Sequence, residues 1–444
     1  MEERERINVA LKEWEEKVLP EVKERSVNFE LFTKLDHIID IVGVRRSGKT
    51  YLMYMVIKKL FESGLDKNSI VYINFENKVL YPLNDKLLDE LLNYFFEKKS
   101  KKIFLFLDEI HNVKGWERWA RSVYDEYKGK IKLVVSGSTS KIMSDKVSSL
   151  LTGRHVPVKL LPLSFKEFLD FKGFTFSLSD LKYSKRKNIE IRKLFEEYMK
   201  FGGFPEVALT NEGMKMDILR AYYEDILYKD VVEKFKVREI SVLENFIKFL
   251  FSNISSYFSF KRSQEYLNSI GVRTSTRTLL KYVSILEETF LFFFLPIFTR
   301  KVKNILKYPR KIYCVDVGLR NVTNPFSEDF GKICENIVFL GLKRKSFKQP
   351  SISVNYWKDE HGNEVDFVVM ERNKAVELIQ VSWKIDEESK KREVRSLVRA
   401  MEEFGLKEAK VLTFDFEAEE KVGKRKIHFI PVCKWLLTSS NTLG

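Results

Sequence analysis

The sequence predicts an α/β fold in which a parallel sheet comes first and smaller modules follow it. Three observations predict the sheet. Apolar stretches alternate with amphipathic ones from about residue 31 to about residue 163, a glycine-rich motif separates one such pair, and another apolar stretch ends in two acidic residues. Alternating strands and helices are typical of parallel sheets, which need helical crossovers. With 444 residues, the chain is long enough for about two to four domains.

The glycine-rich motif follows an apolar stretch at 37–42, and an amphipathic stretch at 51–60 comes after it. It therefore links a strand to a helix, where its glycines let backbone N–H groups surround a phosphate chain and the helix N-terminus adds positive charge. Lys49 can reach the β- and γ-phosphates, and the Thr50 hydroxyl can ligate Mg²⁺. A chance glycine turn is the alternative, but the pattern recurs by accident in only roughly one or two in a hundred chains this long. We therefore predict an ATP site with Mg²⁺, formed by Gly43, Arg45, Arg46, Ser47, Gly48, Lys49 and Thr50.

The strand expected at 102–107 ends in Asp108-Glu109. Ligands bind at the carboxyl ends of parallel strands, where the phosphate loop also lies. We expect Asp108 to hold Mg²⁺ and Glu109 to orient or deprotonate the attacking water. Ser136 or Ser138, at the end of the next strand, can bond the γ-phosphate or its water, and we place Ser138 among the catalytic residues. The alternative for this Ser-Gly-Ser turn is simple loop chemistry.

Two further features qualify as parts of the nucleotide site. Arg154 follows Gly153 and can stabilise charge on the transferring phosphoryl group, in cis or from a neighbouring subunit, although any surface arginine after a turn has the same sequence pattern. A mainly helical segment at 165–236 is interrupted at 201–206, where two glycines and Pro205 make a rigid turn. This turn can approach a bound base, or it is an ordinary turn between helices.

A helix-turn-helix with a wing is predicted between residues 237 and 310. Helices are expected at 260–270 and from 275 or 276 to 288, separated by Gly271 and followed by an apolar stretch at 290–298. Four basic residues can contact phosphates of DNA, although winged helices also contact proteins. They are Arg273, Arg277, Lys281 and Lys301.

Composition limits the partners and the compartment. A formal charge of +15 favours a polyanion such as nucleic acid, but it also fits a merely soluble surface. Three cysteines without a C-x-x-C pair indicate neither a zinc site nor a disulfide framework, which fits a cytoplasmic protein. The first residues are no signal peptide, and the longest apolar run is too short to cross a bilayer, so we expect no membrane association.

The last part of the chain returns to a mixed α/β pattern. Helices are expected at 330–344 and 387–404, and strands at 353–358, 364–369, 375–383, 411–416 and 427–431.

With these residues assembled, the chain resembles a prokaryotic, archaeal-type family of AAA+ P-loop ATPases that carry a C-terminal domain of unknown function with a restriction-endonuclease-like fold. The resemblance implies four domains: an ATPase core at 1–164, a helical lid at 165–236, a winged helix at 237–310 and a PD-(D/E)xK-like α/β domain at 311–444. It also makes an oligomer possible. It rests on the phosphate loop, Leu107-Asp108-Glu109, the segment 133–138, Leu151-Thr152-Gly153-Arg154, the segments 161–165 and 202–206, Glu364-Val365-Asp366-Phe367 and the segment 377–382.

Two positions depart from that family pattern. Glu206 stands where many AAA+ proteins have a nucleotide-sensing arginine, which gives Arg154 more weight. In the nuclease-like segment Asp366 is in place, but Gln380 and Ser382 stand where a carboxylate and a lysine are expected. Lys384 and Glu377 are conceivable replacements, but strand alternation puts Glu377 on the face opposite Gln380. We therefore predict a degenerate nuclease site at Asp366 and Gln380 without appreciable DNA cleavage.

These observations favour a Mg²⁺-dependent ATPase that couples nucleotide state to a winged-helix and nuclease-like half, which contacts DNA or a protein. A nucleotide-gated DNA-binding regulator with incidental hydrolysis is the alternative. An ATP-dependent nuclease is a third reading, disfavoured by Gln380 and Ser382.

Overall fold

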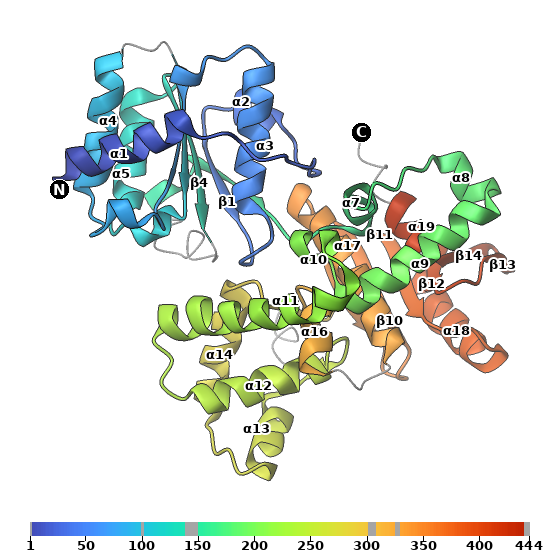
Figure 1. Ribbon diagram of the computed structural model, residues 1–444. Helices are drawn as coiled ribbons and strands as arrows, with labels where there is room; N and C mark the ends of the chain where they lie inside the picture. Colours follow the sequence, from blue (N-terminus) through green and yellow to red (C-terminus); the bar gives the residue numbers. More distant parts are fainter. Residues whose placement is uncertain (1, 99–101, 138–149, 301–307, 325–328, 439–444) are drawn as a thin grey trace. The chain divides into compact units, whose positions relative to one another are not determined.

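The computed structural model describes residues 2–98, 102–137, 150–300, 308–324 and 329–438, and it divides into two compact units, Met1–Leu160 and Leu161–Gly444 (Figure 1). Each unit is built around its own sheets.

The first unit contains a five-stranded sheet in the order β2-β3-β4-β1-β5, and all four strand pairs are parallel. Every residue of β1, β3 and β4 is buried, as expected when helices cover both faces of a parallel sheet. Figure 1 shows α3 and α5 flanking this sheet. The predicted parallel α/β fold is thus confirmed. The elements are α1 (Glu3–Glu16), α2 (Glu30–Thr33), β1 (Ile38–Val42), α3 (Lys49–Glu62), β2 (Ile70–Asn74), α4 (Lys86–Lys98), β3 (Ile103–Asp108), α5 (Trp116–Tyr127), β4 (Ile131–Gly137) and β5 (His155–Lys159).

The sheet register brings three strand ends together. Val42 of β1 pairs with Gly137 of β4, and Leu107 of β3 pairs with Val135 of β4. Because the strands are parallel, the segments that follow β1, β3 and β4 leave the same edge of the sheet. This edge carries the phosphate loop and the acidic pair.

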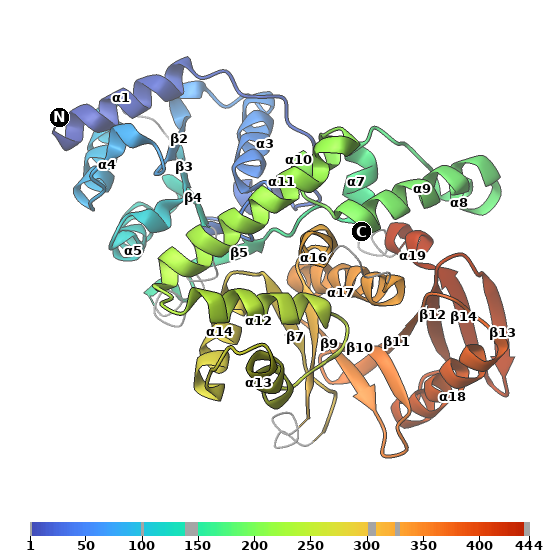
Figure 2. The same cartoon turned by 60° about the horizontal axis from the view of Figure 1, so that its bottom comes forward.

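The second unit begins with helices and a small sheet. The helices are α7 (Phe165–Phe171), α8 (Leu178–Tyr183), α9 (Lys185–Phe201), α10 (Pro205–Leu209), α11 (Glu212–Asp225), which continues into a π-helical stretch (Ile226–Glu233), α12 (Ile240–Ser252), α13 (Phe260–Ser269), α14 (Thr276–Glu288) and α16 (Val317–Thr323). The antiparallel sheet has the order β6-β8-β7, formed by β6 (Tyr257–Phe258), β7 (Phe292–Leu295) and β8 (Arg310–Cys314). Figure 2 shows α12, α13 and α14 gathered beside β7.

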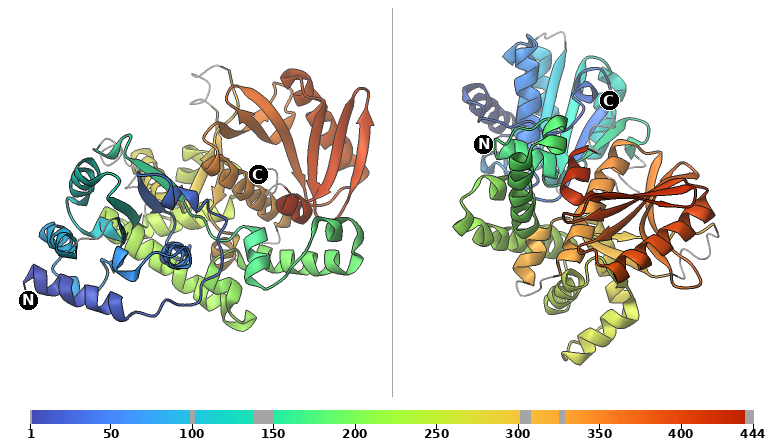
Figure 3. Two further views of the ribbon diagram at one scale, coloured as in Figure 1. Left: turned by 90° about the horizontal axis from the view of Figure 1, so that it is seen from above. Right: turned by 90° about the vertical axis from the view of Figure 1, so that its right-hand side faces the viewer.

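The rest of the second unit is a six-stranded sheet in the order β13-β14-β12-β11-β10-β9, whose strands Figure 3 shows in orange to red. Its centre is parallel (β11-β12-β14) and its two sides are antiparallel. On one face, α18 packs its Leu397 and Ala400 on Val368 and Leu378. The elements are α17 (Phe330–Lys348), β9 (Ile352–Lys358), β10 (Glu364–Glu371), β11 (Lys374–Ser382), α18 (Glu387–Phe404), β12 (Glu408–Thr413), β13 (Ala418–Val422), β14 (Arg425–Pro431) and α19 (Val432–Thr438).

Candidate nucleotide-binding site

The glycine-rich motif forms the connection between β1 and α3. Gly48 is the residue before α3 and has φ 96°, and Arg46 has φ 69°, so the loop turns twice through the left-handed region. A Cβ atom on Gly43 would lie 2.0 Å from the Leu160 carbonyl oxygen, so this position accepts only glycine. The sequence therefore folds into a tight loop that ends at a helix N-terminus, as phosphate binding requires.

Lys49 is nearly buried, and its ammonium group lies against the loop. Nζ donates to the carbonyl oxygens of Gly43 at 3.1 Å and Val44 at 3.3 Å, and it lies 4.0 Å from Glu109 Oε1. A phosphate oxygen is a stronger acceptor for an ammonium group than a neutral carbonyl, so these bonds are exchangeable for a bound anion. Lys49 thus lies beside Glu109, the carboxylate expected to act on the attacking water.

Asp108 ends β3, is fully buried and accepts bonds from three hydroxyl groups. Thr50 Oγ1 and Tyr72 OH each donate to Oδ2 at 2.7 Å, and Ser136 Oγ donates to Oδ1. Thr50 and Asp108, the two predicted metal ligands, thus lie side by side. Mg²⁺ prefers few protein oxygens plus water and phosphate oxygens, so this pair fits Mg²⁺.

Glu109 is held beside Lys49 in a strained conformation. Its φ is 52°, which is uncommon for a residue other than glycine, and such strain concentrates at functional sites. Burial raises the pKa of this carboxyl above its usual range, and the Lys49 ammonium lowers it in part. Within the described ranges Oε2 accepts no hydrogen bond, although His111 Nδ1 lies 3.2 Å away. This carboxylate can therefore accept a proton or a water hydrogen.

The two serines after β4 have separate outcomes. Ser136 is buried, and its hydroxyl accepts from the Glu109 backbone N–H at 3.0 Å while donating to Asp108. It therefore positions the acidic pair. Ser138 lies outside the described residues, so its catalytic role stays a prediction.

The arginines and Ser47 of the loop have distinct surroundings. Arg45 Nη1 lies 3.5 Å from Glu76 Oε1, and Arg46 is exposed. The carbonyl oxygen of Ser47 accepts from Arg25 Nη1 at 2.8 Å. Sequence reasoning missed Arg25, because nothing in its neighbourhood links it to a loop 22 residues away.

Arg154 lies at the end of β1 opposite to the phosphate loop of its own chain. Its carbonyl accepts from the Ile38 N–H at 2.9 Å, which places it beside the start of β1. The phosphate loop follows the other end of β1, five residues on, or about 16 Å at 3.3 Å per residue. The guanidinium makes two bonds to Asp125, at 2.7 and 3.1 Å. A role of Arg154 in the site of a neighbouring subunit stays a prediction.

The turn at Gly202-Gly203 is filled by side chains of its own unit. Asp316 Oδ2 accepts from the Gly203 N–H at 2.7 Å, and a Cβ atom on Gly202 would collide with the same carboxyl group. Burial raises the pKa of Asp316 to about 7. These contacts correspond to the structural alternative considered for the turn. Pro205 begins α10, and its contact with a nucleotide stays a prediction.

A second carboxylate cluster surrounds Lys311 of β8. Its Nζ lies 2.7 Å from Asp366, 2.8 Å from Glu364 and 3.1 Å from Glu335, and its side chain is 4% exposed. Among the residues described, no group of three or more His, Cys, Asp or Glu side chains is arranged to hold a metal ion. An ammonium group therefore occupies the centre of these carboxylates.

The structure brings Asp366 and Gln380 together, as predicted. The Asp366 N–H donates to Gln380 Oε1 at 3.0 Å, and the Val381 N–H donates to Asp366 Oδ2 at 2.9 Å. Glu377 and Lys384, the conceivable replacements for the missing carboxylate and lysine, do not lie with this pair. Glu377 pairs with Lys410 and Lys345, and Lys384 lies beyond the end of β11. Sequence reasoning missed Lys311 and Glu335, whereas Glu364 carried a weak signal because it shares a strand face with Asp366.

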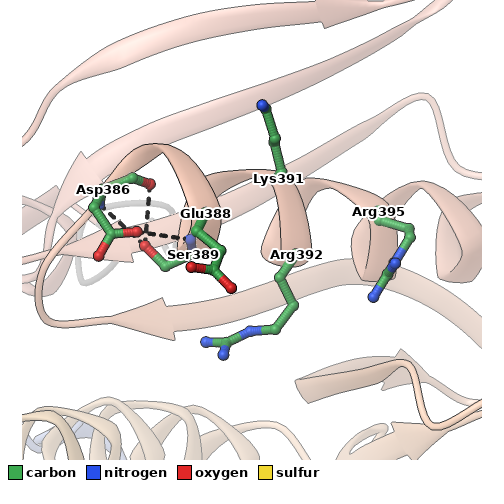
Figure 4. Close-up of a pocket in the computed structure, with 6 residues that line it drawn as sticks. All are labelled: Asp386, Glu388, Ser389, Lys391, Arg392 and Arg395. Atoms are coloured by element: carbon green, nitrogen blue, oxygen red, sulfur yellow. Dashed lines mark hydrogen bonds between the residues drawn. The ribbon is translucent and has the colours of Figure 1, made fainter.

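A surface hollow at the start of α18 is shown in Figure 4. The Asp386 carboxyl accepts from the Ser389 N–H at 2.8 Å, and Arg392 Nη2 lies 2.7 Å from Glu393 Oε1. Asp386 and Ser389 cap the helix and Arg392 pairs with its neighbour Glu393, so we assign no chemistry to this hollow.

The phosphate loop, the acidic strand end and the parallel sheet define an AAA-type P-loop ATPase domain, and residues 35–169 match the family described as an AAA domain. The chain belongs to the family of the uncharacterized protein MJ1544 of Methanocaldococcus jannaschii, with which it is 35% identical over 428 residues, 94% of this chain and 92% of that protein. An uncharacterized protein of Haemophilus influenzae is 32% identical over 358 residues, 80% of this chain and 85% of its own length.

Beyond the AAA domain, residues 192–329 and 330–435 match two domains of unknown function, DUF8612 and DUF4143. Among solved structures, the Walker-type ATPase paby2304 of Pyrococcus abyssi covers 72% of this chain and 94% of its own, with 11% identity and a TM-score of 0.42. A similarity this low carries no argument about function. No described helix is long and apolar enough to cross a membrane.

Proposed function

We propose that this protein is a Mg²⁺-dependent ATPase whose nucleotide state controls the binding of DNA or a protein by its second unit. The observation that carries the proposal is the meeting of four side chains at one sheet edge. Thr50 and Asp108 are bonded at 2.7 Å, and Lys49 lies 4.0 Å from Glu109. A cation, two metal-type oxygens and a carboxylate are the parts that phosphoryl transfer to water needs.

Each side chain has a separate task in this proposal. Lys49 exchanges its carbonyl partners for oxygens of the β- and γ-phosphates. Thr50 and Asp108 hold Mg²⁺, which neutralises developing charge when bound. Glu109 orients the attacking water and accepts its proton. The raised pKa of Glu109 suits this task, because a base works best when its pKa approaches the working pH.

Lys49→Ala tests this assignment. The variant should lose ATP binding, measured with a fluorescent ATP analogue, and should release no phosphate. Tyr51→Ala is a matched control, because Tyr51 lies two residues after Lys49 in the same helix and its side chain is exposed. Normal hydrolysis by Lys49→Ala would show that the site is wrongly assigned.

A winged helix within 237–310 is the proposed contact module. The support is the order of its elements: α12, β6, α13, α14, β7 and β8, with the strands in one antiparallel sheet. Arg273, Arg277 and Lys281 are exposed, whereas Lys301 lies outside the described residues. DNA binding that weakens steeply with salt, and weakens again in an Arg277→Ala and Lys281→Ala double variant, would support DNA as the target. Salt-indifferent binding, or none, would favour a protein.

For the last domain we propose a nuclease-like fold kept for binding. The support is the series α17, β9, β10, β11, α18 and β12, with the last two strands parallel. Lys311 fills the position among the carboxylates that a catalytic metal would need. The ATP-dependent nuclease is therefore disfavoured, and we expect no Mg²⁺- or Mn²⁺-dependent cleavage of linear or supercoiled DNA.

Hydrolysis could still be incidental to gating. Turnover that rises when DNA or a partner is added would favour the coupled ATPase, and unchanged turnover would favour the gated regulator.

The three cysteines are free and buried, which suits the proposed cytoplasmic location. Because Arg154 lies at the far end of β1 from the phosphate loop, a catalytic loss in Arg154→Ala would support action in trans, in an oligomer.

A further inference from the structure

Tyr72 of β2 contacts the metal-ligand candidate Asp108, although no motif singles it out. Its hydroxyl donates to Asp108 Oδ2 at 2.7 Å, and the side chain is buried. Thr50 donates to the same oxygen. When the Thr50 hydroxyl turns to a metal ion, Tyr72 is the donor that remains on Oδ2.

The Tyr72 ring is held by residues that precede the matched AAA domain at 35–169. The ring of Trp14 lies 5.8 Å from the Tyr72 ring, and its Nε1 donates to the Ile70 carbonyl at 2.8 Å. Lys17 Nζ lies 5.2 Å from the centre of the Tyr72 ring and donates to Tyr54 OH at 2.8 Å. The N-terminal segment thus packs directly behind a side chain that bonds Asp108.

The same segment reaches the phosphate loop at a second point. Arg25 is buried, and its Nη1 donates to the Ser47 carbonyl at 2.8 Å. Two separate contacts, one with the Tyr72 ring behind Asp108 and one with the loop, therefore start from residues before the AAA domain.

We propose that Tyr72 is a positioning residue for Asp108 and that residues 1–34 are part of the ATPase site, where they set its affinity for the divalent ion that accompanies ATP. The inference rests on the proposed function. A carboxylate fixed by a second donor presents its oxygen in one orientation, and outer-shell partners of this kind typically change metal affinity.

Tyr72→Phe is compared with Tyr54→Phe as a matched control. The rings lie 5.0 Å apart, and each variant removes one hydroxyl, but the described bonds of Tyr54 include none to Asp108. Binding of a fluorescent ATP analogue is titrated with Mg²⁺ and repeated with Mn²⁺ and in EDTA. We expect Tyr72→Phe to raise the Mg²⁺ concentration at half-maximal binding about tenfold. Binding in EDTA should not change, and Tyr54→Phe should cause a smaller shift, because the Tyr54 hydroxyl interacts with Lys17 and Tyr72 but not with Asp108.

Lys17→Met extends the test to the N-terminal segment, because Lys17 is exposed and its loss endangers folding little. A smaller shift in the same direction is expected. Equal Mg²⁺ dependence of Tyr72→Phe and wild type, or equal shifts in Tyr72→Phe and Tyr54→Phe, would overturn the inference while leaving the ATPase intact. Failure of the wild type to bind the analogue at any Mg²⁺ concentration would overturn the proposed function and this inference together.

Discussion

Each unit has a buried lysine near at least one carboxylate, and the two lysines differ in which of their partners a ligand can replace. Lys49 bonds to two neutral carbonyl oxygens and lies 4.0 Å from one carboxylate oxygen. Lys311 has three carboxylates within 3.1 Å. A ligand can displace neutral acceptors from an ammonium group, but displacing the carboxyl groups around Lys311 would leave buried charge unpaired. The first site is therefore open to an anion, and the second is closed to a cation.

The carboxylates of the two sites also differ in whether their partners can give way to a bound ion. Asp108 takes its bonds from hydroxyl groups of Thr50, Tyr72 and Ser136, which can reorient when a metal ion binds. The second cluster is satisfied by the chain itself, since Tyr313 OH donates to Glu335 at 2.7 Å and Tyr257 OH donates to Glu364. A carboxylate cluster is thus no metal site when the fold supplies its cation.

The largest expected effect on stability is that of Lys311→Met. It leaves buried Asp366 and the partly buried Glu335 and Glu364 without this cation, so we expect the free energy of unfolding to fall by about 3–5 kcal/mol. Urea unfolding measures it. Lys358→Met is the matched control, because Lys358 approaches Glu364 from the exposed side at 3.9 Å. It should cost less than about 1 kcal/mol. Equal losses would contradict the difference drawn between the two lysines.

Lys311→Ala should also turn the closed cluster into a metal site. Oxygens of Asp366, Glu364 and Glu335 would then face a position suited to a hard divalent ion. Nucleotide-free variant should bind Mn²⁺ in an electron paramagnetic resonance titration, and wild type should not bind it there. If the variant does not fold, the wild type still tests the account. Mn²⁺ binding or DNA cleavage by the wild type that disappears in Asp366→Asn would refute it.

The phosphate site could be predicted because its residues are contiguous or end one apolar strand. Contacts such as Tyr72 with Asp108, 36 residues apart, required the pairing of β2 with β3. Lys311 gave no signal, since only the fold brings β8 to α17 and β10. The position of Arg154 could not be predicted, because the sequence does not tell at which edge of the sheet a strand begins. The alternation argument that separated Glu377 from Gln380 was sound, and Glu377 pairs elsewhere.

The carboxylate cluster around Lys311 should make the free energy of unfolding depend on pH. Burial, then the charge of Asp366, raise the pKa of Glu335 from 4.5 to about 8. Between these values the folded protein holds a proton that the unfolded chain has lost. The free energy of unfolding should therefore fall as pH rises from about 5 to about 8, and level off above. Asp316, with a pKa raised to about 7, adds a loss of the same sign.

Glu335→Gln tests the origin of this slope. It mimics the protonated carboxyl, so its stability should fall less with pH than that of the wild type. Urea unfolding across this pH range measures the slope. Asp316→Asn should remove only the part of the slope that comes from Asp316. An unchanged slope in Glu335→Gln would contradict the assignment.

The smallest expected effect is that of Arg154→Ala on ATP affinity. Arg154 lies beside the start of β1 and pairs with Asp125, so affinity should stay within about twofold of wild type in a monomer. Equilibrium binding of the fluorescent ATP analogue measures it. Mixing Arg154→Ala with Glu109→Gln tests action in trans, because restored turnover would require a site shared between subunits.

The central claim is that the site formed at the phosphate loop and the acidic strand end hydrolyses ATP. Retention of labelled ATP by Glu109→Gln tests this claim most directly. The variant keeps Lys49, Thr50 and Asp108 but lacks the base that accepts the proton of water. We predict that it retains near-stoichiometric ATP through gel filtration in Mg²⁺, with phosphate release reduced at least about a hundredfold. Hydrolysis by Glu109→Gln at the wild-type rate would contradict the account.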